Sequence, residues 1–139
     1  MAVKGTTQIE LEMYAALEEL MAQSIRGDFY PSGTRQPSAT AEDAVLTVSN
    51  ADADQIEGGR ARINIYVPTI NNGGESKVPD KGRFTQLEAL GSEIVKTLNA
   101  ADTDYLFELL QAPQAIQVPG KEEWLVNIAL KFKYTTFNE

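Results

Sequence analysis

Carboxylates are the side chains of this sequence whose spacing comes closest to suggesting chemistry. Asp52, Asp54 and Glu57 stand at alternating or nearby positions in one short connection, which is similar to the ligand pattern of a calcium loop. An EF-hand loop also needs glycine at its sixth position, an acidic ligand at its twelfth and a helix on each side. This segment lacks those features, so the sequence favours a solvated acidic turn and leaves a divalent-cation site as the alternative.

Two further acidic pairs lie near the ends of expected elements. Asp102 and Asp104 follow a helical pattern, and Glu42 and Asp43 precede an apolar run. General acid–base catalysis needs a positioned partner of suitable pKa, and nothing in the sequence identifies one. We therefore predict that both pairs face solvent, and we assign no catalytic, cofactor-binding or metal-ligating residue.

The residue types that are missing exclude several classes of function. The 139 residues contain no histidine and no cysteine, which rules out a Ser-His-Asp triad, an imidazole metal site and a disulfide framework. The glycine pairs at 58–59 and 73–74 are not followed by the Gly-Lys-Ser/Thr of a phosphate loop. The formal net charge of −8 argues against a nucleic-acid scaffold. We predict a protein that is not an enzyme, has no cofactor and does not bind nucleic acid specifically.

Two amphipathic helices are predicted among the elements that position these residues. Residues 7–26 repeat apolar side chains at helical spacing, with Thr7 and Glu10 placed as a capping box and Gly27 placed as the residue after the helix. A second stripe predicts a helix from about residue 79 to residue 99. Gly91 lies inside this stripe, which indicates either a close approach of the sheet or of a partner, or a tolerated imperfection.

Four strands are expected around these helices, at residues 44–49, 60–68, 105–118 and 124–134. The last one alternates most clearly, with apolar side chains on one face and Asn127, Lys131 and Lys133 on the other. Part of the third, residues 104–112, is equally compatible with a short helix.

The resulting order is α-β-β-α-β-β in a single domain of residues 1–139. The economical arrangement is an α+β fold of two layers, a mainly antiparallel four-stranded sheet with both helices on one face. No signal-peptide pattern and no apolar run of membrane-spanning length is present, so we expect a soluble protein with no membrane partner.

Two groups of residues are candidates for interaction with partners. The expected loop at residues 28–40 carries Phe29, Tyr30, Arg35 and Pro37, residue types suited to a docking segment, although a plain connecting loop is as good an interpretation.

The second group is a basic strip on two strands. Arg60, Arg62, Lys131 and Lys133 fall on the polar sides of their strands. They indicate either a solvated sheet face or a patch complementary to an acidic surface of a neighbouring copy.

Several stretches of the chain resemble a family of small structural proteins of tailed phages and prophages. They are residues 27–37 (GDFYPSGTRQP), 41–45 (AEDAV), 59–68 (GRARINIYVP) and 124–133 (WLVNIALKFK). Together with the order of elements, they look like tail-terminator, tail-completion or head–tail connector (neck) subunits. The chain departs from the pattern at Gln36, which separates Arg35 from Pro37.

The resemblance implies a non-enzymatic subunit that assembles into a ring and contacts other tail or neck proteins. Its location would be the virion, and the host cytoplasm during assembly. A ring of such acidic subunits would repel DNA phosphates from its lumen, so that a genome passes without being bound. The alternative function is a small α+β module that binds a ligand or a peptide.

Overall fold

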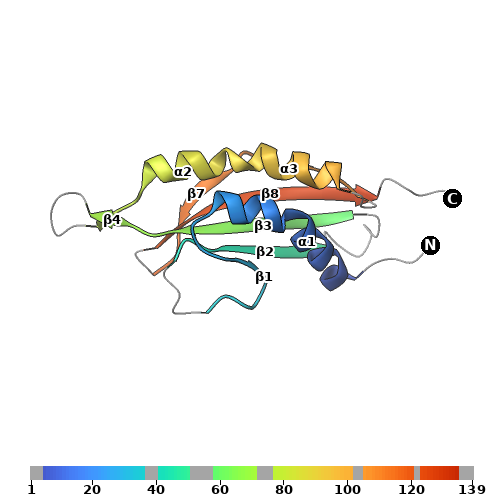
Figure 1. The fold of residues 1–139 in the computed structure, drawn as a ribbon, viewed down its shortest axis with the longest axis horizontal. Helices are drawn as coiled ribbons and strands as arrows, with labels where there is room; N and C mark the ends of the chain where they lie inside the picture. Colours follow the sequence, from blue (N-terminus) through green and yellow to red (C-terminus); the bar gives the residue numbers. More distant parts are fainter. Residues whose placement is uncertain are drawn as a thin grey trace.

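Three helices and a mixed sheet make up the described part of the chain (Figure 1). A computed structural model describes residues 5–36, 41–50, 58–71, 77–101, 105–120 and 123–134. The helices are α1 (Thr6–Ser24), α2 (Lys81–Glu88) and α3 (Leu90–Ala100). The strands are β1 (Phe29–Pro31), β2 (Ala44–Asn50), β3 (Gly58–Val67), β4 (Ile70–Asn71), β5 (Lys77–Val78), β6 (Tyr105–Leu109), β7 (Gln114–Gln117) and β8 (Trp124–Tyr134).

The apolar stripe of α1 is buried as its periodicity predicts. Ile9, Met13, Leu17 and Met21 face the core, one turn apart. The predicted capping box is wrong, because the helix begins at Thr6 and Gly5 occupies the N-cap without a side-chain cap. The predicted helix end is also wrong. The chain turns into an extended conformation at Ile25, whose side chain is buried, so Gly27 does not cap the helix.

The predicted second helix is present as α2 and α3, which follow one another with only Ala89 between them (Figure 1). The Asp80 side chain caps α2 by accepting a hydrogen bond from the Arg83 N–H at 3.1 Å. Gly91 does mark a close approach. A Cβ built there would lie 2.8 Å from the Pro113 ring, in the connection between β6 and β7.

The sheet has the order β1-β2-β3-β8-β6, with β7 also paired to β8. All of its pairings are antiparallel except that of β1 with β2, which is parallel. The α+β class is confirmed, whereas the four-stranded sheet and the α-β-β-α-β-β order are wrong.

The extra strands arise at three places in the chain. Residues 29–31 are held beside β2, although Pro31 and the nearby Gly33 signal a loop. The predicted strand at 105–118 is divided before Pro113, which has no N–H to donate to a ladder. Its first part is the strand β6, not a helix. A short ladder of β4 with β5 is paired separately.

The helices pack on one face of the sheet. α1 contacts β1 and β2, α2 contacts β8, and α3 contacts both β6 and α1. Inward-facing residues such as Leu46, Ile63, Ile128 and Phe107 are almost completely inaccessible and form one core with the helical stripes. The opposite face of the sheet has no helix packed on it among the described elements.

Candidate interaction surface

The predicted docking loop is fastened to the body of the protein by Glu42 and Asp43. These two residues are only 4% and 2% exposed, so the prediction that they face solvent is wrong. The Glu42 carboxylate accepts hydrogen bonds from Arg83 Nε at 2.7 Å and Arg83 Nη2 at 2.6 Å, and from the Arg26 N–H at 2.9 Å. A bidentate ion pair of this kind satisfies a carboxylate that burial would otherwise destabilise.

The ion pair also determines the pKa values of its two members. Burial alone would raise the pKa of Glu42, but the hydrogen bonds from Arg83 and Arg26 outweigh it and hold this pKa below its ordinary value. The hydrogen bonds to Glu42 raise the pKa of Arg83 against the opposing effect of burial. Both groups are therefore charged at neutral pH, and the pair behaves as a permanent link between α2 and the start of β2.

Asp43 makes a second link, to the segment that follows α1. Its carboxylate accepts the Asp28 N–H at 2.8 Å and Arg35 Nε at 3.2 Å. The Gly27 N–H donates to the Glu42 carbonyl at 2.8 Å. A Cβ on Gly27 would overlap the Asp43 carboxylate and the Glu42 backbone, so this position needs glycine for close approach. These contacts hold β1 parallel to β2.

Arg35 belongs to this internal network and does not stand exposed as predicted. Its side chain is 11% exposed and pairs with Asp43 and, at 3.4 Å, with Glu123. The guanidinium carbon lies 3.9 Å from the centre of the Tyr66 ring. Such a stacked, doubly paired arginine fixes a loop to the sheet.

The remaining loop candidates divide in a similar way. Phe29 is half-buried and stacks on Tyr14, with ring centres 4.7 Å apart, so it serves packing. Tyr30 is partly exposed, and its hydroxyl donates to Asp28 at 3.4 Å. Pro37 lies outside the described residues, as do the acidic turn at 52–57 and the pair Asp102 and Asp104.

The basic strip, by contrast, is exposed and gathered as predicted. We call the side of the sheet opposite the helices the open face. In the register of β3 with β8, Arg60 is the direct partner of Lys131, and Arg62 is the partner of Ala129. Lys133 lies at the end of the same row, and all four cations are exposed. Of these four cations, only Lys131 has an ion-pair partner within the described part of the chain, Glu108 at 3.0 Å.

Exposed apolar side chains lie among these cations. Leu106 and Leu110 flank Glu108 and are 45% and 38% exposed. Ile116 on β7, 39% exposed, lies farther along the open face, opposite Leu125 of β8. The sequence alone does not single them out, because residues 105–110 are almost continuously apolar and do not reveal which face each residue takes. The pairing of Leu106 with Lys133 places it on the open face.

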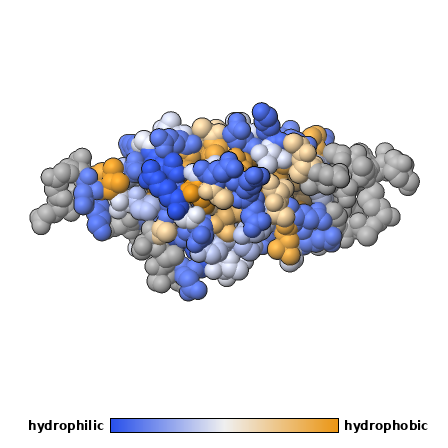
Figure 2. Space-filling view, viewed as in Figure 1, coloured by the Kyte–Doolittle hydropathy of each residue, from blue (hydrophilic) through white to orange (hydrophobic). Residues whose placement is uncertain are grey.

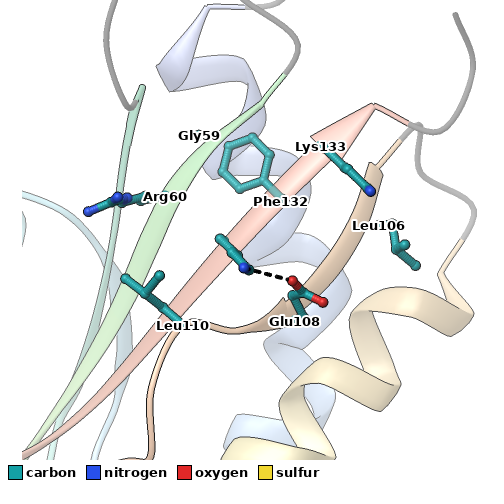
Figure 3. Close-up of a pocket in the computed structure, with 8 residues that line it drawn as sticks. Gly59, Arg60, Leu106, Glu108, Leu110, Phe132 and Lys133 are labelled. Carbon is teal, nitrogen blue, oxygen red and sulfur yellow. Dashed lines mark ion pairs between the residues drawn. The ribbon is translucent and has the colours of Figure 1, made fainter. Parts of the chain in front are cut away.

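The open face is shallowly hollowed at two adjoining places. One hollow, of about 360 Å³, is lined by Arg60, Leu106, Glu108, Leu110, Lys131 and Lys133, together with Gly59 and Phe132 (Figure 3). In the close-up, Leu110 and Arg60 lie on one side of the Lys131–Glu108 ion pair and Leu106 and Lys133 on the other. The second hollow, of about 370 Å³, shares Arg60 and Leu110 with the first and continues past Arg62.

The exposed side of α1 has the opposite character. The helix carries four glutamates and no lysine or arginine. Glu18, Glu19 and Ala15 are exposed, and beside them Leu11 is 52% exposed. The view that has α1 in front of the sheet shows a mostly hydrophilic surface with separate small apolar patches (Figure 2).

A scan against protein-family models and a search of curated proteins both find no match to this chain. Within the described residues, no helix is long and apolar enough to span a membrane. The described residues also hold no group of three or more acidic side chains placed to bind a metal ion.

Proposed function

We propose that this protein is a non-enzymatic structural subunit of a phage or prophage virion that assembles into a ring. The role would be that of a tail-terminator, tail-completion or neck protein, in contact with other tail or neck proteins. The stretches at 27–37, 41–45, 59–68 and 124–133 support it by their resemblance to that family. The observation that carries the assembly part is the open face, a sheet surface on which none of the described helices packs and which mixes exposed leucines with cations.

The two candidate groups take different roles in this proposal. The segment of residues 27–35 is bound internally through Glu42 and Asp43, which makes it a rigid part of each subunit. The exposed cations of the open face remain as the contact surface. With those cations covered by a neighbour, the surface left over is strongly acidic, which suits a ring through which DNA passes without adhering. A structure of the assembled ring with a basic lumen would contradict this last point.

The test is the oligomeric state over a wide range of protein concentrations. Size-exclusion chromatography with light scattering should give one discrete species above a threshold concentration, and negative-stain electron microscopy should show it as closed rings. A monomer at every concentration would overturn the proposal, and so would an open-ended fibre.

The alternative, a module that binds a ligand or a peptide, is favoured by the hollow around Lys131 and Arg60. A monomer that binds a small anion or an acidic peptide with a stoichiometry of one would support it. Isothermal titration calorimetry with acidic peptides distinguishes the two functions, because ring subunits should not bind such peptides stoichiometrically.

A further inference from the structure

The composition of the open face predicts that it is covered by another molecule. A sheet face that only meets water is mainly polar, whereas Leu106 and Leu110 are exposed here beside the cations of the strip. Apolar side chains beside arginine are typical of the contact area between proteins. The two hollows give this surface relief into which side chains of a partner can fit.

Two copies cannot cover their open faces by pressing them together. Such a contact would place Arg60, Arg62 and Lys133 of one copy against the same cations of the other, and like charges at an interface cost several kcal/mol. Among the described residues, Glu108 is the acidic side chain beside the strip, and it is already paired with Lys131. The surface that covers the open face must therefore be acidic and different from it.

The chain itself offers such a surface on α1. The helix carries four glutamates and no lysine or arginine of its own. Glu18 and Glu19 are exposed, and exposed Leu11 beside them supplies an apolar contact. The other helices do not fit as well. α2 and α3 together mix basic residues (Lys81, Arg83, Lys96) with acidic ones (Glu88, Glu93), so they do not present a mainly acidic surface.

Association through the sheet edge at β6 is blocked. The Asn99 side chain accepts the Phe107 N–H at 2.8 Å and donates to the Phe107 carbonyl at 2.9 Å. These backbone groups at the centre of β6 are therefore not available to an added strand.

We infer that the open face of one copy binds the outer surface of α1 of the next copy. Because the two surfaces differ, the contact is heterologous and repeats from copy to copy until the ring closes. This inference rests on the proposed function and identifies the interface by which the ring forms. Binding should weaken as salt is added, since exposed charges are screened, while the leucines retain part of the affinity.

Charge reversal tests the inference with variants that leave the core untouched. The sheet variant is Arg62→Glu with Lys133→Glu, and the helix variant is Glu18→Lys with Glu19→Lys; all four residues are exposed. The matched control, Lys81→Glu with Lys96→Glu, makes the same change of net charge as the sheet variant but on α2 and α3. Circular dichroism establishes that each variant folds, and light scattering gives the concentration of half-assembly.

We expect the sheet and helix variants each to raise the concentration of half-assembly about tenfold or more. The control should change it much less. A mixture of the sheet and helix variants should assemble again, because each unfavourable surface then meets one of opposite charge. Leu110→Gln should weaken assembly about tenfold without changing any charge.

The outcomes separate the inference from the function on which it rests. If the unaltered chain forms rings and the sheet variant assembles as well as the control, the inference is overturned and the proposed function stands. The same conclusion follows if the mixture of variants fails to assemble while each variant is folded. If the unaltered chain stays monomeric at all concentrations, the proposed function is overturned, and the inference with it.

Discussion

The ion pair of Glu42 with Arg83 should be among the largest polar contributions to the stability of this fold. Glu42→Gln keeps the shape of the side chain but places an N–H donor or a weaker acceptor opposite the guanidinium. The two side chains are 3% and 12% exposed, so the unpaired Arg83 would remain largely buried. Breaking such a pair costs about 3–5 kcal/mol, and the partial exposure of Arg83 favours the lower end, about 3 kcal/mol.

For a chain of this length, a loss of about 3 kcal/mol lowers the melting temperature by roughly 10–15 °C. Urea unfolding followed by circular dichroism measures the effect, at a protein concentration low enough that assembly does not contribute. Glu108→Gln is the matched control, because its ion pair with Lys131 joins side chains that are 62% and 51% exposed. The control should cost less than about 1 kcal/mol. A Glu42→Gln variant within about 0.5 kcal/mol of the unaltered chain would refute this account of the ion pair.

Three further changes have defined outcomes. Folding lowers the pKa of Glu42, so the contribution of this carboxylate to stability is complete above its ordinary pKa of about 4.3 and is lost as the pH falls through the folded value. Between about pH 6 and pH 3, the free energy of unfolding should therefore fall less in Glu42→Gln than in the unaltered chain. Gly91→Ala should lower stability by about 1–3 kcal/mol, because the added Cβ meets the Pro113 ring. Gly82→Ala should raise stability, because the nearest atom to its added Cβ is 3.8 Å away. Equal gains in stability at both positions would contradict the packing of Gly91 on Pro113. Asn99→Ala should cost about 1–2 kcal/mol and increase aggregation, measured by turbidity, because it uncovers the edge of β6; unchanged stability and solubility would count against that role.

The sequence predicts those parts of the fold in which apolar side chains recur once per helical turn or at every second residue of a strand. The stripe of Ile9, Met13, Leu17 and Met21 and the alternation in β8 both follow from one local period, and both are confirmed. The exposure of the basic strip is confirmed for the same reason, since residues on opposite sides of a strand must alternate.

The acidic pair that binds the loop could not be predicted in this way. Glu42 meets an arginine 41 residues away, and Asp43 meets the Asp28 N–H 15 residues earlier in the chain. Contacts between residues so far apart leave no pattern in the neighbouring sequence. An acidic dipeptide before a strand is therefore interpreted as a solvated turn. The prediction that Arg35 is exposed is wrong for the same reason. Its partners Tyr66 and Glu123 become neighbours only when β3 and β8 are in register.

The most direct test of the assembly is chemical crosslinking between the two surfaces that we expect to meet. The chain has no cysteine, so Ala129→Cys on the open face and Ala15→Cys on α1 introduce thiols without changing any charge. With a short bis-maleimide, the variant with both cysteines should give a ladder of covalent oligomers that stops at the size of the ring. Each single-cysteine variant should give little beyond monomer. If assembled protein with both cysteines forms no ladder, a contact between the open face and α1 is contradicted. Strong dimers from either single-cysteine variant would contradict it as well.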